Sequence, residues 1–476
     1  MSAFAQLGLD TRAALQSLGA ETAAPGGPTI GAAAMITAAE TIAAALRAKG
    51  SATDEPVVLF IANEPPDLAG FLGIWLAGCV AAPIHVSTPA AAADALVTRL
   101  GSRFAVRAGA VSAIGDAAPP RRRLLKDAAL IVFTSGSTGQ PKGVVVGHTG
   151  LSWKLGALSR LLGFTRDDVV AVPLQLTFIF GIWVSLLALQ SGSRLLLTPK
   201  LAQDPQPLAD ATLLAAVPTL LRTLTTMPSR DAPRLRAVLT GGEPFAPALA
   251  EKVAQRFSSA RIVDLYGLTE TGSCDFAADY GTGASAAGTI GRPTEGVAFR
   301  IAAAEPPLPG GAGELQIDTP ARMLGYLDDP ALTRQAFAGT YFRTGDLAVL
   351  RDDGCVALVG RSKDIVSRGG NKIGPLEIEN LFTRHDGVAA ALAFGVPDER
   401  LGESLHVMIV RRDPALTEAA LRDWARARVE RFKLPDAIHF VDTLPVGRTG
   451  KADRGAARLA LTSPRGGTDT PAPQST

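Results

Sequence analysis

Short apolar runs alternate with helical stretches over most of this chain, from Thr29 to about Gly360. Runs rich in valine, isoleucine and leucine predict strands at residues 57–61, 129–133, 169–172, 194–197, 237–239 and 261–265. Segments rich in alanine, leucine and arginine predict helices at residues 39–47 and 247–255. Because parallel strands need such a crossover, this rhythm predicts an α/β fold with βαβ-type units and a mostly parallel sheet.

The pattern changes twice towards the carboxyl end. Residues 297–360 read as short strands with glycine turns, which predicts antiparallel hairpins and a small β-barrel-like part. Residues 361–461 mix predicted helices at 376–383 and 418–429 with predicted strands at 389–394 and 404–410. We therefore expect a large domain over residues 1–360, a small α+β domain over 361–461, and a disordered tail over 462–476, which is rich in Ser, Thr, Pro and Gly.

The mean hydropathy of +0.20 is high for a soluble enzyme. Residues 68–93 and 169–193 contain no Asp, Glu, Lys or Arg, and each stretch exceeds the about 20 residues that cross a bilayer. Glycine and proline interrupt both, so we interpret them as buried helix-to-strand transitions and not as membrane spans. The amino terminus lacks the basic start and apolar run of a secretory signal. A membrane carrier is thus the disfavoured alternative, and we expect a cytoplasmic protein.

Composition excludes other classes. The net charge of +2 argues against a nucleic-acid-binding protein that neutralises many phosphates. The three cysteines, Cys79, Cys274 and Cys355, are far apart and form no CxxC pair. Neither a disulfide framework nor a structural zinc site is therefore indicated.

The strongest local signal is the segment IVFTSGSTGQPKGVVV, residues 131–146. A predicted strand runs into a loop whose backbone amides, hydroxyls and lysine can bind phosphate oxygens. This is not a Walker A loop, because Gly143 follows Lys142 where Ser or Thr would be needed. The expected phosphate-binding residues are Thr134, Ser135, Gly136, Ser137, Thr138, Gly139 and Lys142.

This segment resembles the signature of the acyl-adenylate-forming (AMP-binding) superfamily, which includes acyl-CoA synthetases, adenylation domains of nonribosomal peptide synthetases and beetle luciferase. Six further motifs of the family follow in its order, at residues 241–244, 266–272, 341–346, 360–364, 368–379 and 445–451. The resemblance is closest in style to stand-alone acyl- or aryl-CoA ligases. It implies that a carboxylate attacks the α-phosphate of ATP to give acyl-AMP and pyrophosphate, and that a second nucleophile, usually a thiol, then takes the acyl group.

The resemblance also implies roles for residues of the large domain. Tyr266, followed by Gly267, is similar to the aromatic residue that stacks on adenine. Thr269 resembles the hydroxyl that contacts the α-phosphate, and Glu270 resembles the ligand of Mg²⁺, a hard ion that prefers oxygen. The backbone wall of the adenine slot corresponds to Gly241, Gly242 and Glu243.

Asp346 resembles the acceptor for both ribose hydroxyls, since a carboxylate can take two donors, and Arg361 resembles the arginine that also reaches the ribose. Lys451 is similar to the lysine of the first half-reaction. A cation placed where a carboxylate meets a phosphate stabilises the transition state more than the ground state.

Lys363 occupies the family's hinge position, about which the small domain rotates as a mobile lid. Gly369 and Gly370 resemble the side-chain-free face that lines a pantetheine tunnel, and a plain Gly-Gly hairpin turn is the alternative interpretation.

The acyl pocket is expected in the uncharged segment that follows Val169. Relatives carry an aromatic residue or a histidine gate there; Phe178 takes that position and no histidine is present. No acidic residue lies between Val169 and Ser193, which disfavours an α-amino acid as substrate because its ammonium would lack a counter-ion. We expect an aromatic or medium-chain aliphatic acid contacted by Phe178, Ile179, Phe180, Gly181, Ile182 and residues 288–291, although these residues could equally be plain core.

The sequence therefore predicts an ATP- and Mg²⁺-dependent acid–thiol ligase. No carrier domain is expected after Leu461, so the thiol is expected in trans, from coenzyme A or a free phosphopantetheinyl carrier protein. Transfer of the acyl group to an amine, hydroxyl or other non-thiol nucleophile is an alternative within the superfamily. Monomer and homodimer both stay open.

Overall fold

A computed structural model describes residues 6–24, 29–116, 119–134, 141–227, 232–280, 288–304, 308–446 and 452–462. The chain divides into two compact units. Unit 1 comprises residues 1–302, 314–344 and 350–357, and unit 2 comprises residues 303–313, 345–349 and 358–476. The α/β class with a large N-terminal and a small C-terminal domain is confirmed, whereas the exact boundary at residue 360 stays a prediction. The predicted tail lies outside the described residues from 463 onwards.

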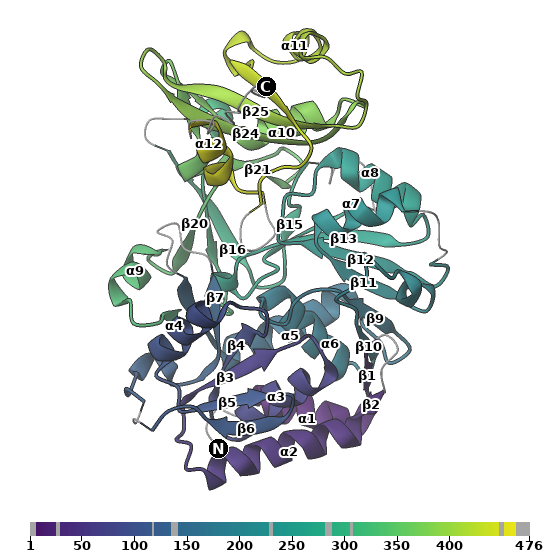
Figure 1. Ribbon diagram of the computed structural model, residues 1–476, viewed down its shortest axis with the longest axis vertical. Helices are drawn as coiled ribbons and strands as arrows, with labels where there is room; N and C mark the ends of the chain where they lie inside the picture. Colours follow the sequence, from purple (N-terminus) through teal and green to yellow (C-terminus); the bar gives the residue numbers. More distant parts are fainter. Residues whose placement is uncertain are drawn as a thin grey trace, which may run out of the picture. The chain divides into compact units, whose positions relative to one another are not determined.

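Unit 1 holds a nine-stranded sheet of order β15-β14-β13-β12-β11-β9-β10-β1-β2 (Figure 1). The six strands from β13 to β1 pair in parallel, as the alternating pattern predicts. The strands are β1 (Glu21–Ala23), β2 (Ile30–Gly31), β9 (Val169–Val172), β10 (Arg194–Leu197), β11 (Leu213–Ala216), β12 (Ala237–Gly241), β13 (Arg261–Tyr266), β14 (Phe276–Asp279) and β15 (Arg292–Pro293).

A seven-stranded sheet of order β18-β8-β7-β4-β3-β5-β6 forms the other large layer of unit 1. Parallel strands lie at its centre, and antiparallel β6, β8 and β18 complete its edges. The strands are β3 (Pro56–Ile61), β4 (Val80–His85), β5 (Phe104–Arg107), β6 (Ala110–Ala113), β7 (Ala128–Thr134), β8 (Lys142–Gly147) and β18 (Gly325–Tyr326).

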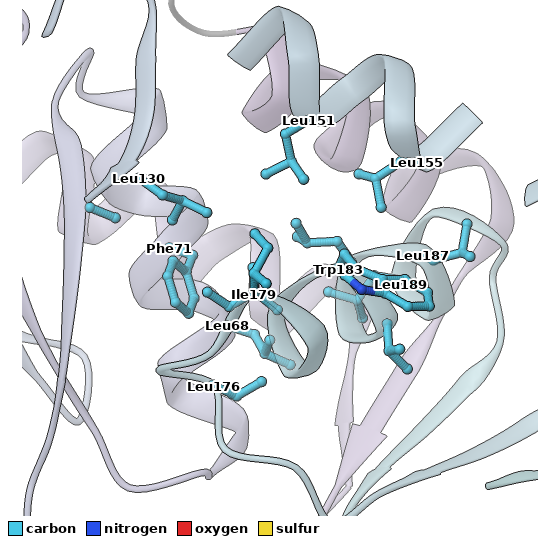
Figure 2. Packing of buried hydrophobic residues seen from close by; sticks show 14 of the residues in the cluster. Leu68, Phe71, Leu130, Leu151, Leu155, Leu176, Ile179, Trp183, Leu187 and Leu189 are labelled. Atoms are coloured by element: carbon cyan, nitrogen blue, oxygen red, sulfur yellow. The ribbon is translucent and has the colours of Figure 1, made fainter. Parts of the chain in front are cut away.

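The largest core cluster of unit 1 draws apolar side chains from both sheets and from the helices packed between them. Figure 2 shows Phe71, Ile179 and Trp183 packed together with leucines around them. The Trp75 indole N–H donates to the carbonyl oxygen of Ala129 at 2.8 Å, which ties a helix to the strand of the glycine-rich segment. The helices are α1 (Gln6–Leu18), α2 (Ala32–Ala48), α3 (Pro65–Leu76), α5 (His148–Leu162) and α6 (Ile179–Gln190).

The two uncharged stretches fold as helix and strand, as their glycines and prolines predict. The first forms α3, β4 and the start of α4 (Ala90–Leu100), and the second forms β9 and α6. Their apolar side chains supply much of the core, which accounts for the high hydropathy. Among the described residues, no helix has both the length and the apolar character that crossing a bilayer requires.

Further helices belong to unit 1. A separate sheet has the order β16-β17-β20-β19 with β21 beside β20. The helices are α7 (Pro218–Thr226), α8 (Pro247–Arg256) and α9 (Pro330–Gln335). The strands of this separate sheet are β16 (Ala298–Ala303), β17 (Gly313–Asp318), β19 (Phe337–Ala338), β20 (Tyr341–Leu350) and β21 (Val356–Arg361).

Unit 2 contains a five-stranded sheet of order β23-β22-β25-β24 with β26 beside β25, and a separate apolar core. Its elements are β22 (Val366–Arg368), β23 (Asn371–Ile373), α10 (Pro375–Thr383), β24 (Val388–Asp398), β25 (Gly402–Arg411), α11 (Glu418–Arg426), β26 (Ala437–Val441) and α12 (Arg454–Thr462).

Burial of His148 makes the stability of unit 1 depend on pH. The imidazole is 1% exposed, lies edge-on to the Trp75 ring at 6.0 Å, and has its pKa lowered to about 4 by burial. The unfolded state therefore binds more protons between pH 6.5 and 4, so the contribution of neutral His148 is complete above pH 6.5 and is lost as the pH falls.

We expect the free energy of unfolding of the wild type, minus that of His148→Phe, to decrease by roughly 3 kcal/mol from pH 6.5 to 4. Urea unfolding at several pH values measures this difference, and groups common to both proteins cancel. A difference that stays constant across this range would contradict the assignment.

Candidate active site

The glycine-rich segment is the connection of an antiparallel hairpin. Strand β7 ends at Thr134 and β8 begins at Lys142, and these two residues pair directly. Residues 135–140 lie outside the described residues, and with them the predicted phosphate contacts of Ser135, Gly136, Ser137, Thr138 and Gly139. The pairing nevertheless brings the Thr134 and Lys142 backbones together where the segment begins and ends.

Arg99 of α4 holds the base of this hairpin. Its guanidinium donates to the carbonyl oxygen of Pro141, and also to that of Leu327 at 3.3 Å. It lies 5.9 Å from the centre of the Phe133 ring. One side chain therefore ties both strands of the hairpin to the residue that follows β18.

Glu270 and Lys142 both contact Tyr326, the first at its hydroxyl and the second over its ring. Strand β18 pairs with β8, placing Tyr326 opposite Val144. The Tyr326 hydroxyl donates to Glu270 Oε1 at 3.0 Å, and Lys142 Nζ lies 5.2 Å from the centre of the Tyr326 ring. Burial and the adjacent Glu270 carboxylate raise the pKa of the Tyr326 phenol, so the hydroxyl remains a donor at neutral pH.

Glu270 lies in the 3-10 turn Thr269–Thr271, which begins three residues after Tyr266, the last residue of β13. The backbone N–H of Met323 donates to the Glu270 carbonyl oxygen at 2.7 Å, so the chain just before β18 also holds this turn. The predicted phosphate and metal residues Thr269 and Glu270 thus lie in one turn, and Glu270 contacts the tyrosine that Lys142 also approaches.

The residues present fit a site in which Glu270 would hold Mg²⁺ together with phosphate oxygens. The contact from Tyr326 leaves Glu270 Oε2 without a donor among the described residues. Among those residues no group of three or more His, Cys, Asp or Glu side chains could enclose a metal. Mg²⁺ is commonly bound through one or two carboxylates together with phosphate oxygens, and the single available carboxylate of Glu270 matches this pattern.

The predicted adenine wall needs glycine for steric reasons. A Cβ on Gly241 would lie 2.3 Å from the Leu265 carbonyl oxygen, and one on Gly267 would lie 2.3 Å from the Cys274 nitrogen. Gly242 has a φ of +82°. Glu243 faces α7, where its Oε2 accepts from the Thr219 backbone N–H at 2.9 Å and from the Thr219 hydroxyl. Tyr266 is partly exposed, and its ring meets that of Phe276 edge-on with the ring centres 6.0 Å apart.

A buried ion pair is linked to the turn that contains Glu270. Lys154 Nζ of α5 lies 2.9 Å from Asp275 Oδ1, and both side chains are 0% exposed. The other oxygen of Asp275 accepts from the Thr271 hydroxyl. Between them, Ser273 and Cys274 adopt left-handed backbone conformations with φ of 70° and 54°. The ion pair therefore fixes a strained connection directly after Glu270.

In unit 2 the structure joins the two predicted ribose residues. Arg361 Nε donates to Asp346 Oδ1 at 2.8 Å; the Asp346 side chain is 6% exposed and that of Arg361 is 52% exposed. Lys363, the predicted hinge residue, lies in the 3-10 turn Ser362–Asp364 that follows β21. The Ser362 hydroxyl donates to the Gly345 carbonyl oxygen at 3.2 Å, so this turn is attached beside Asp346.

Gly369 and Gly370 form the two-residue turn between β22 and β23. Arg368 and Asn371 pair across it, and the two glycines have φ of 54° and 83°. The hairpin interpretation is thus observed, and the tunnel role stays a prediction. Lys451 lies outside the described residues, although its neighbour Ala452 pairs with Val446.

The predicted acyl-pocket residues differ in exposure. Ile179 and Ile182 are buried in the main core at 6% and 1%, whereas Phe178 is 37% exposed at the start of α6. Phe180 is partly buried and stacks on Trp183 at 5.4 Å. A Cβ on Gly181 would lie 2.4 Å from the Gln175 carbonyl oxygen, so glycine there is a packing requirement. Gly288 and Gly291, at the ends of the other predicted pocket segment, both have positive φ.

Sequence reasoning missed Tyr326, Arg99 and Lys154. Tyr326 follows a glycine in Met323-Leu-Gly-Tyr326, a short segment with no polar cluster to indicate a site. Lys154 lies in an amphipathic helix, where a lysine normally indicates the solvent face. Each has a hydrogen-bond partner more than 40 residues away in the sequence, so local pattern alone could not have found them.

Two family models match this sequence, and their ranges include several of the residues described above. A family model described as AMP-binding enzyme matches residues 105–327, and one described as AMP-binding enzyme C-terminal domain matches residues 377–451. The first range contains the hairpin, the turn of Glu270 and Tyr326, and the second lies in unit 2.

Several named proteins are similar to this chain over much of its length. A feruloyl-CoA synthase from Amycolatopsis sp is 30% identical over 451 residues, covering 88% of this chain and 91% of its own. A sulfoacetate–CoA ligase from Cupriavidus necator is 33% identical over 355 residues, covering 72% of this chain and 70% of its own.

Among solved structures, ATP-bound MatB from Rhodopseudomonas palustris matches with a TM-score of 0.86 at 25% identity, over 97% of this chain and 99% of its own. The predicted superfamily and the predicted ligase class are both confirmed. The chain belongs to the AMP-binding enzymes, as an acid–thiol ligase of the acyl-CoA synthetase type.

Proposed function

We propose that this protein activates a hydrophobic carboxylic acid as acyl-AMP, with ATP and Mg²⁺, and transfers the acyl group to coenzyme A. The observation that carries the proposal is the placement of Glu270 and Lys142 on one tyrosine at the end of the glycine-rich hairpin. A carboxylate that would hold Mg²⁺ and a lysine ammonium at the same phosphate-binding loop would together neutralise the negative charge of a polyphosphate.

The residues of unit 1 bind and orient the phosphates in this proposal. Lys142 offers a cation to phosphate oxygens, and the Thr269 hydroxyl is assigned to the α-phosphate. Glu270 would hold Mg²⁺, which when bound neutralises phosphate charge and that of the departing pyrophosphate. Tyr266, a partly exposed residue, is assigned to stack its ring on adenine.

In unit 2, the buried Asp346 carboxylate is oriented by Arg361. A carboxylate held this way can accept two hydroxyl donors, which supports the assignment to the ribose. Lys451 is assigned to the junction between the attacking carboxylate and the α-phosphate, where negative charge accumulates in the transition state.

The nature of the acid follows from the uncharged segment after Val169. No Asp, Glu, Lys or Arg occurs from there to Ser193, and α6 is buried over most of its length. A pocket lined from this segment would offer no counter-ion to a charged substituent. The similarity to a feruloyl-CoA synthase over 88% of the chain supports an aromatic acid in particular.

Coenzyme A is proposed as the acceptor because the feruloyl and sulfoacetate relatives are named for it. A fatty acid–[acyl-carrier-protein] ligase from Streptomyces coeruleorubidus is also similar, at 31% identity over 399 residues. A carrier protein is therefore the alternative acceptor to test beside coenzyme A.

A pyrophosphate-release screen tests the proposal. Hydroxycinnamic, benzoic and medium-chain aliphatic acids are each offered with Mg²⁺–ATP, and a small dianionic acid serves as the matched polar control. We expect release with at least one aromatic acid, loss of release on chelation of Mg²⁺, and a thioester product when coenzyme A is present. Activity with the dianion alone would reject the hydrophobic pocket, and no release with any acid would overturn the proposed function.

A further inference from the structure

Tyr326 is a buried core residue that carries a hydroxyl group, and packing of the core alone does not require that hydroxyl. The residue is 5% exposed and its ring belongs to the main apolar core, a position that phenylalanine would fill equally well. The hydroxyl instead donates to the Glu270 carboxylate at 3.0 Å. A hydrogen bond to an ionised acceptor is roughly twice as strong as one between neutral groups, so this contact orients Glu270 firmly.

The backbone around Tyr326 is fixed on both sides, so its side chain is a rigid support. The Leu324 N–H donates to the Val145 carbonyl oxygen, and the Leu327 N–H donates to that of Gly143, both at 2.8 Å. These bonds anchor β18 along β8, the strand that begins with Lys142. A shift of the tyrosine relative to Lys142 would therefore require breaking strand pairing.

The ring also keeps opposite charges apart. Lys142 lies over the ring face, Glu270 accepts at the hydroxyl, and among the described residues no carboxylate pairs with Lys142. A direct ion pair between the two would neutralise both and leave neither available to a ligand. The ring face attracts the ammonium and the hydroxyl attracts the carboxylate, so one side chain holds the two charged groups at separate positions.

We propose that Tyr326 is a positioning residue of the phosphate site, which aims the Glu270 carboxylate at Mg²⁺ through its hydroxyl and seats the Lys142 ammonium on its ring. The proposal rests on the proposed function, because it assigns Glu270 to Mg²⁺ and Lys142 to phosphate.

Equilibrium binding of ATP by calorimetry, with Mg²⁺ and with EDTA, separates these two contributions without any turnover. Tyr326→Phe keeps the ring and loses the hydroxyl, so we expect ATP affinity to fall about tenfold with Mg²⁺ and less than about twofold in EDTA. Tyr326→Leu also loses the ring, so affinity should fall in EDTA as well. The matched control is Tyr280→Phe, because the buried Tyr280 hydroxyl has no hydrogen-bond partner among the described residues.

A double-mutant cycle distinguishes positioning from a structural role. If Tyr326 acts through Glu270, Tyr326→Phe should cause no further loss of Mg²⁺–ATP affinity in a Glu270→Gln background. Equal losses in both backgrounds, a variant that no longer folds, or unchanged affinity for Mg²⁺–ATP would each overturn the proposal. Failure of the wild type itself to bind Mg²⁺–ATP would instead refute the proposed function.

Discussion

Replacing Lys451 with alanine is expected to lower the rate of acyl-AMP formation by at least about a hundredfold, while transfer from preformed acyl-AMP to coenzyme A changes little. The physical reason is that two anions, the carboxylate and the α-phosphate, approach each other only in the first half-reaction. Pyrophosphate release measures that step, and AMP release from synthetic acyl-AMP with coenzyme A measures the second.

The described residues around Lys451 show how the chain that bears it is anchored. Val446 pairs with Ala452, and the Asp453 N–H donates to the Pro445 carbonyl oxygen at 2.9 Å. Arg454 then donates to Glu379 Oε1 at 2.6 Å and to the Ala393 carbonyl oxygen at 3.0 Å. Both flanks are therefore fixed to unit 2, so the alanine variant should remove a charge and leave the fold of this region intact.

Lys49→Ala is the matched control, because Lys49 is an exposed lysine at the end of α2 in unit 1. It should leave both half-reactions at wild-type rates. Equal losses of both half-reactions in the Lys451 variant would show that the lysine is structural or serves the whole cycle, and would refute its assignment to the first step.

Replacing Lys154 with methionine is expected to destabilise unit 1 by about 3–5 kcal/mol. The change leaves Asp275 buried without its cation, and burial already raises the pKa of this carboxyl. The variant must therefore either keep an unpaired charge in the core or bind a proton. Urea unfolding at neutral pH measures the loss in the free energy of unfolding.

A second substitution isolates the cause. The double variant Lys154→Met, Asp275→Leu removes both charges, and we expect it to recover most of the lost stability because no unpaired ion remains. Arg160→Met is the surface control, because the Arg160 and Glu295 side chains are 59% and 58% exposed. Loss of this exposed ion pair should leave the unfolding midpoint unchanged. If the single and double variants are equally unstable, lost packing and not the unpaired carboxylate causes the effect.

The fold could be predicted where local pattern decides it. The predicted strands at residues 169–172 and 194–197 match β9 and β10, because continuous apolar runs with turn residues at their ends mark buried parallel strands. The helix predicted at residues 39–47 proved longer, as α2 begins at Ala32. Alanine-rich sequence carries little amphipathic signal, so its start could not be placed.

The site could be predicted only as far as motifs identify residues one at a time. Glu270 and Lys142 were predicted from their motifs, but the contact that relates them depends on Tyr326, 56 residues beyond Glu270. Pairing of a two-residue strand across such a distance depends on tertiary packing and leaves no periodic signal in the sequence.

The late position of β18 in the chain also bears on synthesis. The hairpin base at Lys142 is finished early, yet its third strand arrives only with Gly325 and Tyr326. During translation, therefore, a nascent chain can form the glycine-rich hairpin long before the hydrogen bond from Tyr326 to Glu270 can form. The proposed phosphate site is therefore complete only after residue 326 of the 476 has been synthesised.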